Sequence, residues 1–393
     1  MSESAYDLVV VGLGAAGSAT VREAARRGAR VLGLDAHHPP HDRGSSHGES
    51  RITRQAIGEG LDYVPLALRS HPLWRQLEAE TGETLMRTVG ALMISAPDLG
   101  AVHHGKPDFL EQTIEAAQAF GIDHEVLDAA ATRKRYPQFQ VRDHERAYFE
   151  PGAGILYPER CIAAQLAAAR SDGAAIRTGE RVRAIEPTAG RVRVVSDAGI
   201  CEAGQVVIAA GAWTGQLLGG VWSRRLILHR QSLHWFQPDD PAPFAPERFP
   251  VFIWMHGADD GDWFYGFPQD PQVGGVKIAS EQFAIAAPGP DAWDRTADRD
   301  EALAAYDRHV VGRIDALPRR WLRSTACIYT DAPESQFVIG PDPERANVIV
   351  VSACSGHGFK HSPAIGEAVA AWALDGAAPP ILSPFAPDRL LLG

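Results

Sequence analysis

Three glycines near the start of the chain have the spacing of a phosphate-binding turn. Gly12, Gly14 and Gly17 form a G-x-G-x-x-G pattern after the apolar run at residues 8–11. The first glycine permits a tight turn, the second lets the backbone approach a pyrophosphate, and the third allows a helix to pack closely on a strand. Asp35 follows a second apolar run, where a carboxylate can accept hydrogen bonds from a ribose. This combination predicts a dinucleotide site; the alternative is a glycine-rich turn in an ordinary α/β unit.

Charged residues elsewhere could bind an anion. Arg51 and Arg54 are three residues apart, and a guanidinium pairs with a carboxylate through two hydrogen bonds. The pair therefore suits recognition of an anion, or it forms a surface salt-bridge pair. Lys277 lies inside a strand pattern, where a lysine is uncommon and therefore informative. The plain alternative to a functional role is a lysine on an edge strand. The histidines around residues 37–47 are irregularly spaced and have no accompanying carboxylate pair, so we predict no metal site.

The elements that must position these residues alternate between strands and helices. Strands at residues 8–11 and 31–34 flank a helix at 18–27, whose N-terminus offers free backbone N–H groups to phosphates. A buried strand at 206–213 runs into a glycine turn and could supply a second cofactor contact. Further strands are expected at 88–95, 175–177, 326–330 and 348–352, and a hairpin at 182–185 with 192–195. Further helices are expected at 62–80, broken at Pro65 and Pro72, and at 111–120, 127–136, 161–170, 298–309 and 364–374.

The α/β signals lie at both ends and in the middle of the chain, around inserts rich in aromatic strands. Residues 226–277 carry short alternating stretches with many aromatics, which predict an antiparallel sheet that could form the wall of a pocket. We therefore predict a discontinuous cofactor domain from residues 1–90, 151–225 and 325–393. Residues 91–150 and 226–324 form the predicted substrate domain.

Composition excludes several classes of protein. A net charge of −11 over 393 residues argues against a protein that binds nucleic acids or anionic membranes in general. No signal peptide is evident, and the apolar stretch at 364–382 is interrupted by acidic residues and prolines, so no membrane span is expected. The four cysteines are widely spaced, which favours a reducing cytoplasm over a zinc site or a disulfide scaffold.

Over nearly its full length the chain resembles the monomeric sarcosine oxidase and N-methyl-tryptophan oxidase family of flavoproteins. The resemblance rests on the glycine pattern and on five segments: GSSHGESRITR at 44–54, GEGLDYVPLALR at 58–69, YGFP at 265–268, CIYT at 327–330 and SGHGFK at 355–360. It implies FAD as the dinucleotide in place of NAD. It also implies an α/β fold in which a Rossmann-like FAD-binding domain joins an antiparallel-sheet substrate domain, as in glutathione reductase and D-amino-acid oxidase.

The resemblance also implies roles for individual residues. Cys327 matches the cysteine that holds the flavin through a thioether, although a buried apolar cysteine is the plain alternative. Arg54 and Lys360 match the pair that binds the substrate carboxylate. Arg51 and His47 match groups beside the isoalloxazine ring, where positive charge stabilises the reduced anionic flavin.

Three further positions match the family. Lys277 corresponds to the lysine that activates dioxygen, Tyr265 to a tyrosine beside the substrate amine, and Val182 to a backbone contact with the adenine portion. Other cofactor contacts implied by the shared motifs fall on Ser45, Gly356, Gly358 and again Lys360.

Three departures from the family touch the pocket or its rim and point away from sarcosine itself as the substrate. Glu281 replaces a histidine four residues after the oxygen-activating lysine, and Ile57 replaces a tyrosine or similar polar aromatic. The segment between Tyr265 and Lys277 is one residue longer than in the sarcosine oxidases. Glu281 is expected to contact the substrate, and we hypothesise that it favours a substrate with a second cationic group.

The expected activity is an FAD-dependent oxidase of a secondary or N-methyl α-amino acid. It would oxidise the C–N bond to an imine that hydrolyses, while dioxygen becomes hydrogen peroxide. The amine is expected to bind in its neutral form, because a cationic pocket lowers its pKa. Alternatives are an oxidase of a cyclic imino acid or of a sugar–amine adduct, a flavin dehydrogenase that passes electrons to a protein partner, and a flavin-binding regulatory protein. We expect a cytoplasmic monomer.

Overall fold

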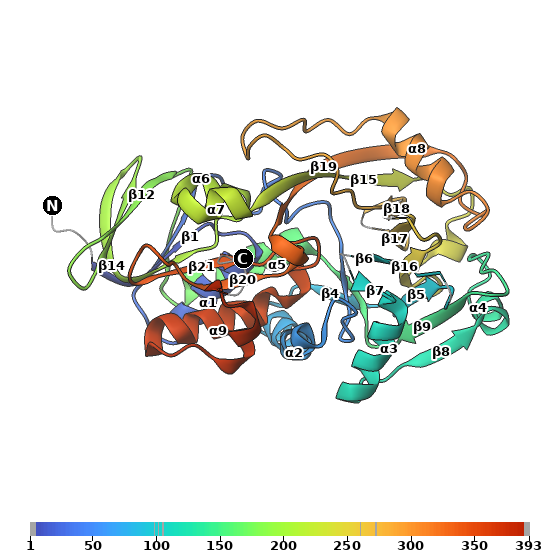
Figure 1. Ribbon diagram of the computed structural model, residues 1–393, viewed down its shortest axis with the longest axis horizontal. Helices are drawn as coiled ribbons and strands as arrows, with labels where there is room; N and C mark the ends of the chain where they lie inside the picture. The colour runs from blue at the N-terminus through green and yellow to red at the C-terminus, as the bar shows by residue number, and fades with distance from the viewer. Residues whose placement is uncertain are drawn as a thin grey trace.

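Two eight-stranded sheets organise the protein and lie in opposite halves of the computed structural model (Figure 1). The structure describes residues 5–97, 99–100, 102–103, 106–259, 261–271 and 273–388. This arrangement of sheets and helices confirms the predicted mixed α/β fold.

The first sheet contains the predicted strand–helix–strand unit. Its parallel strands follow the order β11 (Ala175–Thr178), β2 (Val31–Asp35), β1 (Ala5–Val11), β14 (Gly199–Ile208) and β21 (Val348–Ser352). β20 (Val338–Pro341) pairs antiparallel with β21. The predicted hairpin, β12 (Val182–Pro187) and β13 (Val192–Ser196), is confirmed and pairs with the first half of β14.

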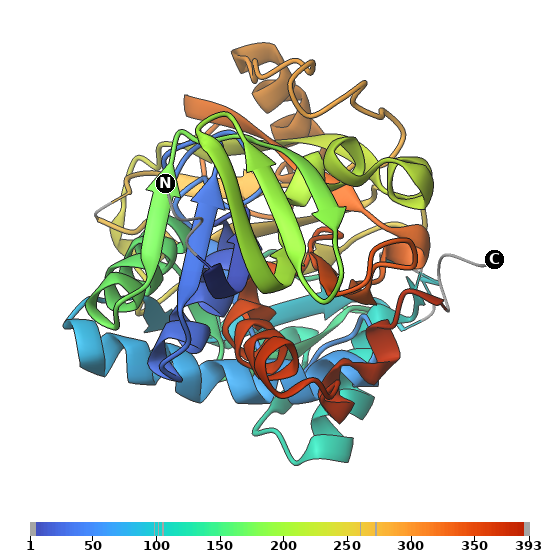
Figure 2. The ribbon, with the colours of Figure 1, turned by 90° about the vertical axis from the view of Figure 1, so that its left-hand side faces the viewer.

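Both faces of this sheet are covered, which explains why the second half of β1, residues 8–11, is apolar at every position. Leu8 and Val10 belong to the core formed with α1 (Ala15–Arg26), α5 (Pro158–Ser171) and α9 (Ser362–Asp375). Val9 and Val11 belong to a separate core with the β12–β13 hairpin, α6 (Thr214–Leu218) and α7 (Gly220–Arg225). Figure 2 shows the green strands β12–β14 above the red helix α9.

The second sheet is antiparallel except where β5 and β16 pair in parallel. Its order is β19 (Trp321–Asp331), β15 (Ile227–Phe236), β18 (Val276–Ala279), β17 (Trp263–Phe267), β16 (Val251–Met255), β5 (Ala91–Ser95), β9 (Arg146–Glu150) and β8 (Glu125–Asp128). The helices α3 (Phe109–Phe120), α4 (Ala129–Arg135) and α8 (Arg299–His309) lie in the same half of the molecule (Figure 1). The predicted aromatic antiparallel sheet is therefore confirmed.

The remaining elements connect these layers. A three-stranded antiparallel sheet contains β3 (Arg51–Thr53), β10 (Gly154–Leu156) and β4 (Met86–Thr88), and a short pair contains β6 (Val102–His103) and β7 (Lys106–Pro107). The long helix α2 (Val64–Thr81) packs against α5 and α9. Short 3-10 turns are η1 (Leu61–Tyr63), η2 (Gly211–Trp213), η3 (Ala242–Phe244), η4 (Pro333–Ser335), η5 (Phe359–His361) and η6 (Pro380–Phe385).

Three predicted elements differ from the structure. The predicted break at Pro72 is wrong, because α2 continues through this residue; the burial of Leu66, Leu73 and Trp74 outweighs the cost of about 3 kcal/mol for a proline inside a helix. The predicted strand at 88–95 is two strands, separated where Gly90 has a φ of +76°. The predicted helix at 127–136 begins only at Ala129, after the end of β8.

The register of the second sheet aligns several residues of interest on one face. Tyr265 pairs with Ala279, and Phe267 pairs with Lys277 on the neighbouring strand. Because directly paired residues and alternate residues of a strand share a face, Tyr265 and Lys277 project to the same side of the sheet. Cys327 and Tyr329 lie two residues apart on β19 and also share a face.

Candidate active site

The glycine turn between β1 and α1 brings the backbone of two strands into close approach. Gly12 has a φ of +90°, and a Cβ atom there would lie 2.4 Å from the carbonyl oxygen of Ala209 on the segment after β14. A Cβ atom at Gly17 would lie 1.8 Å from the carbonyl oxygen of Gly12. At Gly14 the space is open, because the nearest atom to an added Cβ is Ser46 Oγ at 3.9 Å. The turn therefore requires glycine at two positions and leaves open space beside the backbone at the third.

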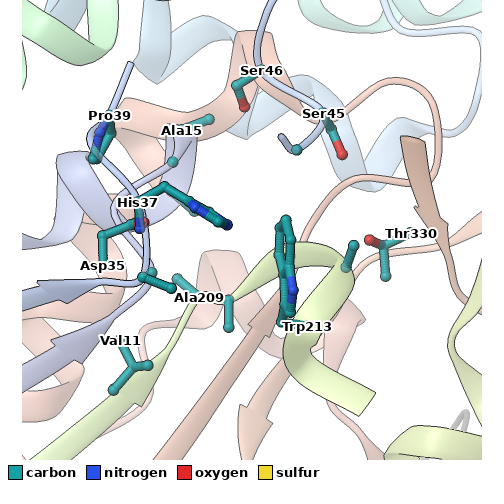
Figure 3. A pocket seen from close by; sticks show the side chains of 18 of the residues that line it. Val11, Ala15, Asp35, His37, Pro39, Ser45, Ser46, Ala209, Trp213 and Thr330 are labelled. Atoms are coloured by element: carbon teal, nitrogen blue, oxygen red, sulfur yellow. The ribbon is translucent and has the colours of Figure 1, made fainter. Parts of the chain in front are cut away.

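A cavity of about 280 Å³ opens beside this turn (Figure 3). The Asp35 carboxylate, at the end of β2, accepts hydrogen bonds from the backbone N–H groups of Leu13 and His37, both at 2.8 Å. The imidazole of His37 points into the cavity in Figure 3, and its Nε2 atom is buried with no hydrogen-bond partner among the described residues. Its ring lies 5.5 Å from that of Trp213, measured between centroids. Predicted cofactor residues that line this cavity are Gly12, Gly14, Asp35, Ser45 and Val182.

A second, smaller cavity of about 120 Å³ shares walls with the first. Residues that line both are Ala15, Ser45, Ser46, Ala353 and Cys354. The smaller cavity collects predicted site residues from distant parts of the chain: Arg51, Arg54, Tyr265, Glu281, Gly356, Gly358 and Lys360. The structure thus brings together the two ends and the middle of the sequence at one place.

Two cations of the smaller cavity are buried and already hold partners. Arg54, directly after β3, donates to a Glu59 carboxylate oxygen at 2.6 Å and to the carbonyl oxygen of Ala56 at 2.5 Å. Lys360, in η5, donates from Nζ to the carbonyl oxygen of His357 at 2.7 Å. Burial lowers the pKa of Lys360 to about 8, although Glu59 opposes the shift. Both side chains retain further donors for an anionic ligand.

Acidic and phenolic groups line the same cavity. Glu281 follows β18, and its Oε1 atom accepts a hydrogen bond of 2.9 Å from the hydroxyl of Tyr329 on β19. Burial raises the pKa of Glu281 to about 8, while the bond from Tyr329 and the charge of Lys360 act in the opposite direction. Burial and the neighbouring Glu281 raise the pKa of Tyr265 above its usual range. These acidic groups are therefore neutral near pH 7, beside the cations of the same cavity.

Arg51 and Lys277 are fixed by backbone carbonyl groups. Arg51 donates to the carbonyl oxygens of Ser45 at 2.6 Å and Ser50 at 2.8 Å. Lys277 Nζ donates to the carbonyl oxygens of Gly48 at 2.8 Å and Ser50 at 3.0 Å, and to the Ser50 hydroxyl at 3.2 Å. Burial and the charge of Arg51 lower the pKa of Lys277. Lys277 lies in an inner strand, between β15 and β17, so the edge-strand alternative is wrong.

Four predicted residues lie outside the linings of both cavities: Gly17, His47, Lys277 and Cys327. His47 was expected to contribute positive charge, but burial and the nearby Arg51 lower its pKa to about 3, so its imidazole is neutral near pH 7. Cys327 is fully buried on β19, and burial raises the pKa of its thiol to about 11. Ile328 follows Cys327 on β19, and its carbonyl oxygen accepts a hydrogen bond from the hydroxyl of Ser45.

Sequence reasoning missed three partners of the predicted residues. Glu59 pairs with Arg54, Ser50 holds Lys277, and Tyr329 binds Glu281. Glu59 and Tyr329 stand inside two of the segments that carried the resemblance, GEGLDYVPLALR and CIYT. The ionisable side chains of Glu59 and Tyr329 were the signal available in the sequence. Their partners, Arg54 and Glu281, lie in a loop or far along the chain, and the sequence alone does not place them.

Among the described residues, no cluster of three or more His, Cys, Asp or Glu side chains could hold a metal ion. In the same part of the chain, no helix has the length and apolar character needed to cross a membrane.

Comparison with known proteins gives a consistent family. The sequence profile described as DAO, FAD dependent oxidoreductase, matches residues 7–372. Monomeric sarcosine oxidase from Streptomyces avermitilis is 38% identical over 389 residues, which cover 98% of each chain. N-methyl-L-tryptophan oxidase from Yersinia pestis (strain Pestoides F) is 35% identical over 385 residues, which cover 98% of this chain and 99% of the relative.

Solved structures agree with these sequence matches. NikD, an amino acid oxidase essential for nikkomycin biosynthesis, has a TM-score of 0.82 at 25% identity, with 98% of this chain and 97% of that chain covered. L-proline dehydrogenase from P. horikoshii shares the fold, with a TM-score of 0.81 at 22% identity and 98% of both chains covered. With a glycine turn that fits a dinucleotide and full-length relatives of this kind, the chain belongs to the family of FAD-dependent oxidoreductases.

Proposed function

We propose that this enzyme is an oxidase of a secondary or N-methyl α-amino acid. It oxidises the C–N bond to an imine, which hydrolyses, and it converts dioxygen to hydrogen peroxide. The observation that carries the proposal is the meeting of Arg54 and Lys360 in a buried cavity that shares walls with the cavity at the glycine turn. Two relatives that match over 98% of this chain are named as oxidases of N-methyl amino acids, sarcosine and N-methyl-L-tryptophan.

The residues of the larger cavity fit a bound FAD. The open backbone at Gly14 and the start of α1, which no side chain caps, suit a pyrophosphate. The Asp35 carboxylate suits a ribose, and the orphaned Nε2 of His37 gives a buried polar atom that a ligand could satisfy. Ser45 and Val182 would add further contacts in this cavity, and Gly356 and Gly358 would add them from the smaller one. When bound, the flavin supplies the two-electron oxidation that protein side chains lack.

Lys360 and Arg54 would bind the substrate carboxylate and fix the amino acid in one orientation. Lys360 has used one donor within the protein, and the Arg54 guanidinium has used two. Charge-assisted hydrogen bonds from both side chains would hold a carboxylate in this buried place. Tyr265 and Glu281, on the sheet side of the cavity, would face the amine.

Lys277 is proposed as the cation that stabilises the negative charge that develops on dioxygen as it is reduced. Its three acceptors favour the ammonium form, in opposition to the effect of burial. Arg51 is proposed to supply permanent positive charge beside the flavin, and His47 a neutral imidazole there. This assigns to Arg51 the charge that we had expected from both residues.

Covalent attachment of the flavin through Cys327 is a further part of the proposal. Its support is the position of Cys327 in the CIYT segment, two residues before Tyr329, which lines the smaller cavity. Arg51 and Lys277 both lower the pKa of this thiol, against the larger effect of burial. These two cations would favour the thiolate that a thioether bond requires.

We also propose a cytoplasmic monomer with two domains. Free cysteines at all four positions agree with a reducing compartment. The two large sheets support a cofactor domain at 1–90, 151–225 and 325–393 and a substrate domain at 91–150 and 226–324, although the boundary at 324/325 falls within β19. The ends at 1–4 and 389–393 lie outside the described residues.

A peroxide-coupled screen of purified holoenzyme tests the proposed activity. The panel should contain N-methyl amino acids, cyclic imino acids and a sugar–amine adduct, each also offered with an artificial electron acceptor. We expect peroxide with at least one N-methyl or other secondary α-amino acid. Reduction of the acceptor without peroxide would identify a dehydrogenase, and turnover of the cyclic acids or the adduct alone would replace the proposed substrate class.

A further inference from the structure

We infer that Glu281 receives the ammonium group of the substrate: its carboxylate pairs with the charged nitrogen in the cavity and accepts its proton. The inference rests on the proposed function, because it assumes an amino acid bound through its carboxylate. It replaces two sequence-based expectations, namely that the amine arrives in its neutral form and that Glu281 selects a second cationic group.

The position of Glu281 supports this role. The side chain lines the smaller cavity together with Arg54 and Lys360, the two proposed ligands of the carboxylate. Its Oε1 atom accepts a hydrogen bond from Tyr329, and Tyr329 also lines the cavity. The residue is only 8% exposed. A carboxyl group is therefore held in place at the wall of the cavity, within the same small volume that would contain an amino acid.

The charges of the cavity favour a zwitterionic ligand. Arg54 and Glu59 form an ion pair and cancel. Arg51 and Lys360 line the cavity as further potential cations and Glu281 as a potential anion, so the site offers a charge of each sign to the carboxylate and the ammonium of an amino acid. Without Glu281, the substrate ammonium would lie among the cations of the cavity, with Glu59 as the acidic residue left in its lining. A substrate with a second cation would instead bring a further positive charge into a buried site that already holds Arg51 and Lys360.

The pKa of Glu281 indicates how the proton moves. Burial raises this pKa to about 8, so the empty site carries a proton on Glu281 near pH 7. When an ammonium binds, Glu281 would first lose its proton to solvent. The N–H bond of the bound ammonium then breaks as a new O–H bond forms on Glu281, and the free amine remains. The step needs no oxidant or second reactant. Ionisable groups that act on Glu281 are Tyr329, Asp331 and Cys327 from β19, Tyr265 from β17, Lys360 from η5, and Glu59.

A matched pair of ligands isolates the ammonium. N,N-dimethylglycine and 3-methylbutanoate have the same heavy-atom shape and the same carboxylate, but the first has a charged nitrogen where the second has a carbon. Binding of both to holoenzyme would be measured by anaerobic calorimetry from pH 6 to pH 9, in buffers of different ionisation enthalpy that report proton release. The ratio of the two affinities cancels the contribution of Lys360 to carboxylate binding.

In the wild type, we expect dimethylglycine to bind more tightly, and the affinity ratio to rise about tenfold from pH 6 to pH 7 and to level off above pH 8. Proton release should accompany its binding at pH 7 and disappear at pH 9. In Glu281→Gln, which keeps the shape and can accept the Tyr329 bond, the ratio should fall by about tenfold to a hundredfold and lose its pH dependence. Binding of 3-methylbutanoate to this variant should persist, which shows that the site is folded.

Three results would overturn the inference. A ratio that is unchanged in Glu281→Gln would show that this carboxyl group does not contact the nitrogen, while the amino-acid site itself would stand. Tighter binding of N-methyl-L-lysine than of N-methyl-L-norleucine, with the preference lost in Glu281→Gln, would place Glu281 against a side-chain cation. Failure of the wild type to bind either ligand of the matched pair would refute the carboxylate site, and the inference with it.

Discussion

Replacement of Lys360 by methionine tests the proposed carboxylate site most sharply. Lys360 is 6% exposed, and its Nζ atom has one protein acceptor, the carbonyl oxygen of His357. Methionine fills a similar volume without charge. A hydrogen bond between charged groups contributes about 1.5–3 kcal/mol, which corresponds to about tenfold to 150-fold in affinity. We therefore expect KM to rise by this factor, with a smaller change in kcat, because the carboxylate is bound equally before and during the reaction.

The pH dependence gives a second, independent measurement. The pKa of Lys360 in the free enzyme is about 8, below its usual range because of burial. A bound carboxylate favours the ammonium form and so raises this pKa. Affinity for 3-methylbutanoate should therefore be constant below pH 8 and should fall towards a tenfold loss per pH unit above it. In Lys360→Met this decrease above pH 8 should vanish.

The control is Lys134→Met, which removes the same charge from an exposed position at the end of α4. Steady-state kinetics and anaerobic titrations of the three holoenzymes would be compared at several pH values. If KM and the pH profile of Lys360→Met matched those of the control, Lys360 would not bind the carboxylate. A loss confined to kcat would equally contradict the reasoning.

Three further predictions follow from the same geometry. Lys277→Met should slow reoxidation by dioxygen about 10²–10³-fold, measured by stopped-flow mixing of reduced enzyme with oxygen; an unchanged rate would exclude the proposed role of this cation. Denatured wild type should retain its yellow colour after acid precipitation, whereas Cys327→Ala should release all flavin and Cys354→Ala should retain it; release from the wild type would exclude the tether. Gly14→Ala should fold normally, because no atom lies closer than 3.9 Å to the added Cβ, yet the methyl group would obstruct the pyrophosphate. Its affinity for FAD should fall at least tenfold in a flavin-fluorescence titration, and an unchanged affinity would mean that the cofactor does not approach this residue.

Local patterns predicted the cofactor half of the protein well. Glycine at positions 12 and 17 reflects contacts between backbone atoms close in sequence or on segments that follow adjacent parallel strands, and such contacts leave a residue-type signature. The β12–β13 hairpin was equally visible from alternation. The break expected at Pro72 failed because tertiary burial of α2 outweighs local preference, and a pattern of residues does not reveal that burial.

The chemistry of the site was only partly predictable. Arg54, Lys360 and Glu281 were chosen correctly as residues that share a cavity: Arg54 and Lys360 lie in family motifs, and Glu281 was identified by its position four residues after Lys277. Their charge states were not predictable, since each depends on a partner from another element. Glu59 neutralises Arg54, Arg51 helps to keep His47 neutral, and burial with Tyr329 sets the pKa of Glu281. Such pairings arise only when the two large sheets and the loops between them are in place.

The most direct test of the whole account is the visible spectrum of the purified protein during anaerobic addition of N-methyl amino acids. We expect a yellow protein whose flavin absorption bleaches with at least one of them and returns on admission of air, with formation of hydrogen peroxide. A colourless protein that takes up no FAD, or a yellow one that no secondary amino acid bleaches, would contradict it.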